Sequence, residues 1–322
     1  MINFIDENNQ GLAPGVGPSV AILMGTMNGA KFLSEQLDSL AAQTHQNWVL
    51  IASDDGSTDD TIRILKVYQA KWPAGKLIIK EGPKRGFCAN FLSMACDPNI
   101  KADYYAFCDQ DDVWLAAKLA VAIKNISENH EETSPYLYCS RTTYVNEKLN
   151  KVGCSRLFTF PRTFRNALIQ SIAGGNTMVF NREVKELLVK VGPVPHPFHD
   201  WWLYQLVTSV DGIVYYDPIP QILYRQHKDS LVGGGNSVIA RVQRISQVLR
   251  GRFSYWCDQN ILALHIAKPF ITRGNQEILG LFKVMRTARL KDRFRLMEVC
   301  GLYRQTWGGT ISLVLAALLK KI

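Results

Sequence analysis

The chain has 322 residues, of which 47% are hydrophobic and 20% are charged, a composition typical of a globular protein and unlike that of a disordered or fibrous chain. The seven cysteines are scattered and form no CxxC pair, which argues against a zinc knuckle or a disulfide framework and favours a reducing compartment. The net charge of +9 comes from one end, because residues 241–322 carry 15 Lys/Arg against 4 Asp/Glu while residues 1–240 carry 22 against 24.

Short apolar runs alternate with amphipathic segments along the first third of the chain. Apolar runs of this length predict strands, and apolar residues at helical spacing predict helices. The expected strands are Ser19–Met24, Trp48–Ala52, Leu77–Ile79 and Tyr104–Cys108, and the expected helices are Lys31–Thr44, Asp59–Trp72 and Gly86–Cys96. This alternation predicts an α/β fold with crossover connections and a mainly parallel sheet flanked by helices.

Polar or acidic residues follow three of these strands. They are Thr26 and Asn28, then Asp54 and Asp55, then Asp109 and Asp111. Ligands of open α/β sheets bind outside the carboxyl ends of the strands. We therefore expect these side chains to converge on one edge of the sheet.

The strongest single motif is the acidic run Asp109-Gln110-Asp111-Asp112. Three neighbouring carboxylates repel one another unless a cation compensates their charge. Mg²⁺ and Mn²⁺ bind carboxylate and phosphate oxygens together, so such a run suits a nucleotide diphosphate. The alternative is a solvated turn in which Asp112 caps a helix containing Trp114 and Leu119. With the other motifs considered, we expect Asp109 and Asp111 to bind the metal and Asp112 to cap this helix.

A second acidic motif, Asp54-Asp55-Gly56-Ser57-Thr58-Asp59, follows the strand Trp48–Ala52. A carboxylate at a strand end can accept hydrogen bonds from a pyrimidine N–H or a ribose hydroxyl, and Gly56 permits a tight turn. Ser57, Thr58 or Asp59 can also cap the following helix. We expect both roles here, nucleoside binding and helix capping.

Together these motifs resemble glycosyltransferase family 2, which has the GT-A fold, and within it a bacterial rhamnosyltransferase-like branch. The residues that carry the resemblance are Thr26-Met27-Asn28, the two acidic motifs, Phe107–Trp114 (FCDQDDVW), His199–Trp202 (HDWW) and Tyr224–His227 (YRQH). They extend from Val20 to about Gly233.

The resemblance implies a role for each matching position. Donor-nucleotide contacts are implied for Thr26, Asn28, Asp54, Asp55, Arg85, Asn90 and Gln110, metal binding for Asp109 and Asp111, and general-base catalysis for Asp200. Asp111 is the expected direct ligand of Mn²⁺ or Mg²⁺. The chain departs from the family at Pro83-Lys84-Arg85-Gly86, where an Asn-X-Gly segment is usual, so the nucleotide contact there is less well supported.

Proton chemistry supports Asp200 as the base independently. A sugar hydroxyl has a high pKa, so its attack benefits from a positioned proton acceptor. One carboxylate suffices for direct, inverting displacement. Trp201 and Trp202 could offer apolar faces to a sugar ring. The alternative is that His199 and Asp200 cap a helix at Trp201–Val210, with both tryptophans in the core.

Two further segments have open alternatives. Arg225 and His227 follow a strand-like stretch, Ile213–Tyr224, and could meet the leaving diphosphate, with His227 completing the metal shell or being purely structural. The loop Gly174–Thr177 precedes an expected strand, Met178–Phe180, and is either an acceptor-binding loop or a plain turn.

The basic end of the chain is expected to be helical. Arg286, Arg289, Lys291, Arg293 and Arg295 alternate with Leu290, Phe294, Leu296 and Met297, a pattern that suits docking on an anionic membrane surface. A solvated helix face is the alternative, and the absence of a recognised motif disfavours nucleic acid. No secretory signal is visible, and the apolar run Ile311–Leu319 is too short to span a bilayer.

We therefore predict a lead-in at residues 1–18, a GT-A domain at 19–235 and a basic helical region at 236–322. The predicted reaction is inverting, metal-dependent transfer of a sugar to a saccharide hydroxyl in surface polysaccharide synthesis. The expected donor is dTDP-β-L-rhamnose, or alternatively a UDP-hexose, and the acceptor is expected to be lipid-linked at the inner face of the cytoplasmic membrane. A nucleotidyltransferase and a non-catalytic assembly factor on the membrane are the alternatives from other classes.

Overall fold

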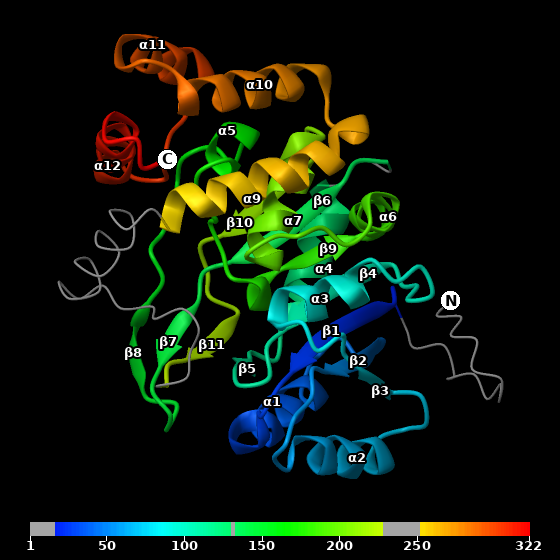
Figure 1. Ribbon diagram of the computed structural model, residues 1–322. Helices are drawn as coiled ribbons and strands as arrows, with labels where there is room; N and C mark the ends of the chain where they lie inside the picture. The colour runs from blue at the N-terminus through cyan, green and yellow to red at the C-terminus, as the bar shows by residue number, and fades with distance from the viewer. Residues whose placement is uncertain (1–16, 130–132, 228–251) are drawn as a thin grey trace. The chain divides into compact units, whose positions relative to one another are not determined.

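The computed structural model describes residues 17–129, 133–227 and 252–322 (Figure 1). The chain divides into two compact units. The first comprises residues 1–156, 173–193 and 215–228, and the second comprises residues 157–172, 194–214 and 229–322, in each case as far as they are described. The predicted boundary at residue 235 and most of the predicted lead-in lie outside the described residues, so both stay predictions.

A seven-stranded mixed sheet forms the centre of the first unit. In spatial order its strands are β10 (Ile213–Asp217), β6 (Tyr136–Ser140), β9 (Val179–Asn181), β4 (Tyr104–Cys108), β1 (Val20–Thr26), β2 (Trp48–Asp54) and β3 (Leu77–Glu81). β3, β2, β1 and β4 run parallel, whereas β9 is antiparallel to both β4 and β6. The predicted α/β class with a mainly parallel, mixed sheet is confirmed.

The four parallel strands are the four that the apolar runs predict. β4 has the expected bounds, while β1, β2 and β3 each extend two residues further at their carboxyl ends, and β1 begins one residue later than expected. β1 and β2 are buried along almost their whole length, as expected for strands covered on both faces. Since Thr26 pairs with Asp54 in register, the two predicted nucleoside-binding loops begin side by side.

Helices follow three of these strands, β1, β2 and β3. They are α1 (Ala30–Ala41), α2 (Thr61–Lys71) and α3 (Phe87–Ala95), with α4 (Lys118–Asn129), η1 (Gly175–Thr177) and α6 (Arg182–Val191) later in the unit. The predicted helices are thus present but shorter. One prediction is wrong: Trp114 lies in a strand, and the helix of Leu119 begins only at Lys118.

A smaller four-stranded sheet belongs to the same unit (Figure 1). Its spatial order is β5 (Val113–Trp114), β11 (Ile222–Arg225), β7 (Thr143–Val145) and β8 (Lys151–Cys154). The stretch predicted as one strand, Ile213–Tyr224, is therefore two strands that belong to different sheets. β11 pairs antiparallel with β5, which brings the chain after Leu223 next to the acidic run.

The second unit is helical. Its elements are α5 (Phe164–Ala167), α7 (His199–Ser209), α9 (Arg252–Ile266), η2 (Lys268–Phe270), α10 (Arg273–Thr287), α11 (Leu290–Cys300) and α12 (Trp307–Leu318). The predicted C-terminal helices are therefore present. Among the described residues, the helices are too short or too polar to cross a bilayer.

Candidate functional site at the strand ends

Asp54, the last residue of β2, is the most heavily bonded side chain of the site. Its Oδ1 accepts hydrogen bonds from Thr26 Oγ1 at 2.9 Å and Ser57 Oγ at 2.5 Å, and its Oδ2 accepts from the backbone N–H groups of Gly56 and Ser57. The residue is only 7% exposed. The predicted neighbours Thr26 and Asp54 are thus brought together, and the carboxylate fixes the loop after β2.

Asp55 ties this loop to the one that follows β3. Its two carboxylate oxygens accept hydrogen bonds from the backbone N–H groups of Lys84 and Gly86, at 2.6 and 2.8 Å. Gly86 has φ +89°, a conformation that favours glycine. Arg85, between them, has an exposed side chain, so its guanidinium is accessible to an anionic ligand. The usual Asn-X-Gly segment is thus replaced by a loop that Asp55 holds through backbone groups.

Asn90, predicted to contact the nucleotide, is buried at 2% exposure. Its Nδ2 donates to the Ser53 carbonyl at 2.8 Å, and its Oδ1 accepts from Ser53 Oγ at 2.6 Å. Both amide atoms are therefore engaged in holding α3 against β2. A direct nucleotide contact would break this pair, so the geometry favours a supporting role for Asn90.

Asn28 and Gln110 connect three loops. Asn28, at φ +50°, accepts a hydrogen bond from the Thr58 N–H at 2.8 Å. Gln110 forms a two-point clamp on the backbone of Met27: Oε1 accepts from its N–H and Nε2 donates to its carbonyl, both at 2.9 Å. A Cβ at Gly29 would collide with this Gln110 amide, which explains the glycine. Both residues, predicted to contact the donor, thus tie the loop after β1 to its neighbours.

The acidic run brings Asp111 against His227. Asp111 Oδ2 lies 2.7 Å from His227 Nε2, and both side chains remain partly exposed, at 25% and 11%. Asp109 is half-buried at the end of β4. Among the described residues no three His, Cys, Asp or Glu side chains form a complete metal cage. A carboxylate and an imidazole fit a divalent cation whose remaining ligands are phosphate oxygens and water.

Arg225 is a buried residue whose side chain contacts the backbone of the acidic run. Its side chain is fully buried, and it donates to the carbonyls of Asp111 and Glu147 and to Glu35 Oε2, at 2.9, 2.6 and 2.7 Å. The guanidinium also stacks over the Phe32 ring, 4.4 Å from its centroid. Because these contacts use its Nε and both terminal nitrogens, Arg225 positions the backbone of Asp111, whereas the sequence had predicted a contact to the diphosphate.

Asp112 differs from its two acidic neighbours and does not cap a helix. It is fully buried, and its oxygens accept hydrogen bonds from Asn176 Nδ2 and from the Arg225 N–H. Burial raises the pKa of Asp112 well above its usual range, and the neighbouring carboxylates of Asp111 and Asp109 raise it further. The loop containing Asn176 thus supports the acidic run, a contact that the sequence pattern did not indicate.

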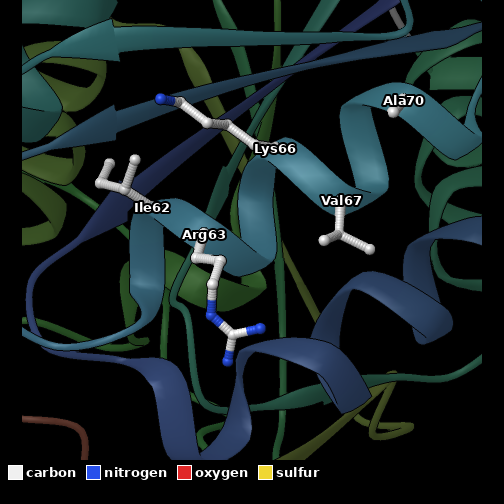
Figure 2. Close-up of a pocket in the computed structure, with 5 residues that line it drawn as sticks. All are labelled: Ile62, Arg63, Lys66, Val67 and Ala70. Carbon is white, nitrogen blue, oxygen red and sulfur yellow. The ribbon is translucent and has the colours of Figure 1, made fainter.

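The described part of this unit has a hollow at the strand ends and a second one on α2. The smaller, of about 250 Å³, is lined by Asp54, Gly56, Ile62, Ile79, Lys80, Glu81 and Lys84, so it lies at the ends of β2 and β3. The larger, of about 480 Å³, is lined by five residues of α2 alone. Figure 2 shows these residues on the helix, among them Arg63 and Lys66. The smaller hollow lies at the strand ends and includes Asp54 in its lining, so it is a candidate nucleoside pocket.

Asp200 belongs to the second unit. It lies in the first turn of α7 and is half-buried, and Oδ1 accepts a hydrogen bond from the Trp201 N–H at 2.7 Å. The helix begins at His199, two residues earlier than predicted. Both tryptophans are buried, at 4% and 0% exposure, and Trp201 Nε1 donates to the Ala167 carbonyl. Their burial agrees with the alternative that places both tryptophans in the core, and the expectation that they offer apolar faces to a sugar ring is wrong.

Residues 21–188 match the model of the Glycosyl transferase family 2 family. The dTDP-rhamnosyl transferase RfbG of Shigella flexneri is 29% identical over 70% of this chain and 78% of its own length. The Escherichia coli UDP-Glc:alpha-D-GlcNAc-diphosphoundecaprenol beta-1,3-glucosyltransferase WfgD is 31% identical over 60% of this chain and 71% of its own length. The structure of S. aureus TarS 1-349 in complex with UDP-GlcNAc superposes with a TM-score of 0.51 and 14% identity, covering 87% of this chain and 79% of that one.

The sheet, its acidic strand ends and the match over half of the chain define a nucleotide-sugar transferase with a GT-A-like fold. The chain belongs to glycosyltransferase family 2. The family resemblance seen in the sequence motifs is thereby confirmed.

Proposed function

We propose that the chain transfers a sugar from a nucleotide diphosphate to a saccharide hydroxyl with inversion, in the synthesis of a bacterial surface polysaccharide. The observation that carries the proposal is the Asp111–His227 pair at 2.7 Å, on the edge where the loops of Asp54 and Asp55 are also fixed. The cation would bind after β4 and the nucleoside at the ends of β2 and β3, since ligands of open α/β sheets bind outside the carboxyl ends of the strands.

Rhamnose from dTDP-β-L-rhamnose is the proposed donor, since RfbG is described as a dTDP-rhamnosyl transferase. A UDP-hexose is the second candidate, because WfgD, of similar identity, is described as using UDP-Glc. The hollow at the ends of β2 and β3 suits either nucleotide, since thymine and uracil present the same ring N–H. Asp54, whose carboxylate already accepts four hydrogen bonds, would shape the wall of this hollow.

Asp109, Asp111 and His227 would hold Mn²⁺ or Mg²⁺. When bound, the cation neutralises charge on the leaving diphosphate, a Lewis-acid role. Arg225 holds the backbone of Asp111 in place, and Gln110 keeps the acidic run joined to the loop after β1.

Asp200 is the proposed base. Its carboxylate takes the proton of the acceptor hydroxyl while the acceptor oxygen forms its bond to the anomeric carbon. The bond from that carbon to the diphosphate oxygen breaks, and the nucleoside diphosphate leaves with the electron pair. A single displacement of this kind inverts the anomeric centre.

The acceptor is proposed to be lipid-linked, with the enzyme peripheral on the inner face of the cytoplasmic membrane. Of the basic residues expected to face the lipid, Arg289, Lys291 and Arg295 are exposed. Arg286 and Arg293 are not available: Arg286 pairs with Asp258, and Arg293 is 3% exposed and donates to backbone carbonyls.

Thermal shift with dTDP, UDP and GDP, each with and without Mn²⁺, tests the donor proposal. We expect dTDP or UDP to stabilise the protein, more strongly with Mn²⁺, and Asp111→Asn to remove the Mn²⁺-dependent part. Asp200→Asn should keep the shift and lose transfer, with NMR of the product establishing inversion. Failure of both nucleotides to stabilise the protein in either condition would overturn the transferase proposal, and unchanged transfer by Asp200→Asn would favour a different base.

A further inference from the structure

The last helix of the described chain exposes an uncharged apolar face. α12 contains Trp307, Ile311 and Leu315 at four-residue spacing, and Leu319 follows at its end. These side chains are 78%, 61%, 54% and 59% exposed. Residues four apart in a helix lie on the same face, so the four form one continuous stripe.

The opposite face of α12 is packed. Leu313, Ala316 and Ala317 are buried, and Arg293 of α11 donates a hydrogen bond to the Ala317 carbonyl at 2.6 Å. The N-terminus is capped by Thr306, whose Oγ1 accepts from the Gly309 N–H. α12 is therefore packed against its own unit through one face. The stripe on its other face is exposed although the helix is docked.

A helix that is apolar on nearly all sides is normally buried. α12 has no charged residue between Trp307 and Leu318, and large apolar patches on a protein surface usually mark an interaction site. Trp307 continues the patch toward residues 157–160, because its ring meets Phe160 edge-on with centroids 5.6 Å apart. Leu157 in the same segment is 45% exposed.

Two lysines border the C-terminal end of this apolar face. Lys320 directly follows the stripe and is exposed, with Lys321 beside it. In the described part of residues 252–322 the exposed Lys and Arg outnumber the exposed Asp and Glu by eight to four. An apolar helix face bordered by a tryptophan and by lysines matches a lipid interface, where indole rings occupy the headgroup level and lysines meet anionic headgroups.

We propose that the stripe of Trp307, Ile311, Leu315 and Leu319 inserts into the acyl boundary of an anionic bilayer, with α12 lying in the plane of the interface. This goes further than the proposed peripheral association, on which it rests, because the contact is made chiefly by apolar insertion of α12. The basic residues of α10 and α11 contribute attraction at longer range.

Flotation of the full chain with vesicles tests the proposal. We expect binding to phosphatidylcholine vesicles that contain phosphatidylglycerol, persisting in part at high salt because the apolar contact is not screened. Ile311→Gln with Leu315→Gln should lower the partition coefficient at least tenfold. The matched control is Leu262→Gln with Ile266→Gln, an exposed i,i+4 pair on α9, which should remain within twofold of the parent chain.

Two further measurements separate the alternatives. Quenching by brominated lipid should report insertion of Trp307 and disappear in Trp307→Phe, and Lys320→Gln with Lys321→Gln should weaken binding only to anionic vesicles. Equal flotation of the α12 variant and its control, or a dimer in sedimentation that the α12 variant dissociates, would overturn the proposal. Donor-induced thermal shift is measured on every variant, so loss of vesicle binding with the shift retained bears on α12 alone and not on the transferase function.

Discussion

The strand-end loops of the first unit and the helical second unit differ in what their polar side chains bind and in which side chains they expose. In the loops, Asp54 accepts four hydrogen bonds and Asp55 accepts two from the backbone of the next loop. In the second unit, buried polar side chains such as Arg293 of α11 and His196, in the segment before α7, form hydrogen bonds in the interior, while the exposed face of α12 is apolar. The loops are therefore held by hydrogen bonds at the place where a small ligand would be positioned, whereas α12 presents an exposed apolar surface.

The largest expected effects come from two adjacent carboxylates. We expect Asp111→Asn to lower the transfer rate at least about 10³-fold, because the cation loses a ligand, with little change in melting temperature since the side chain is partly exposed. Asp112→Ala should instead cost about 2–4 kcal/mol of stability, because it leaves two buried donors without acceptors.

Initial rates at saturating donor and thermal unfolding of both variants check this contrast. Asp60→Asn, at an exposed position directly before α2, is the control and should change neither quantity appreciably. Equal loss of melting temperature in Asp111→Asn and Asp112→Ala would show that the run acts as one structural element, and the distinction between its members would fail.

The contrast within the acidic run also shows what the sequence could predict. The four parallel strands and the convergence of Thr26, Asp54 and Asp55 follow from local patterns of apolar and polar residues. The burial of Asp112 does not, because its partners Asn176 and Arg225 lie 64 and 113 residues further along the chain.

In the second unit, too, the burial of polar side chains depends on partners that are distant in the sequence. Arg293 is part of a basic helical pattern, yet it is buried because its guanidinium reaches the end of α12, 24 residues away. Trp201 and Trp202 lie beside the proposed base in sequence, but packing places them in the core. Local pattern therefore predicts strand ends and their loops, whereas the burial of a polar or aromatic side chain depends on contacts between distant segments.

Acid should destabilise the second unit through its buried histidines. Burial lowers the pKa of His196 to about 4, and its Nδ1 accepts a hydrogen bond from the Phe198 N–H, which a second ring proton would oppose. Burial lowers the pKa of His199 to about 3. Because an unfolded histidine titrates near 6.5, the stability of the unit is intact above that pH and is lost as the pH falls, by about 3 kcal/mol at pH 4 for His196 alone.

Urea unfolding between pH 8 and pH 4 measures this loss. His196→Asn keeps an acceptor for the Phe198 N–H but no group that titrates in this range, so its stability should fall less steeply with decreasing pH. The quantity compared is the slope of the free energy of unfolding against pH, because the variant also loses the packing of the imidazole ring at every pH. A slope equal to that of the parent chain would mean that His196 is protonated in the folded state.

A glycine in the strand-end loops should not tolerate a methyl group. A Cβ at Gly82 would lie 2.8 Å from Asn90 Oδ1 and 2.9 Å from both the Asp54 carbonyl and Asp55 Oδ1. We expect Gly82→Ala to lower stability by about 1–3 kcal/mol and to weaken the donor-induced thermal shift, because the loops after β2 and β3 must separate. Unchanged stability and donor binding would show that these loops are looser than their hydrogen bonds indicate.

The same substitution should have the opposite sign in the second unit. Gly280 lies within α10 and is exposed, and a Cβ added there would meet no described atom within 4 Å outside its own helix turn. We expect Gly280→Ala to raise the free energy of unfolding by about 0.5–1 kcal/mol, since alanine loses less backbone entropy in a helix. Denaturant titration of both single variants and of the double variant is the measurement. The two effects should add, because the sites share no partner, and a destabilising Gly280→Ala would mean that another part of the chain covers this face of α10.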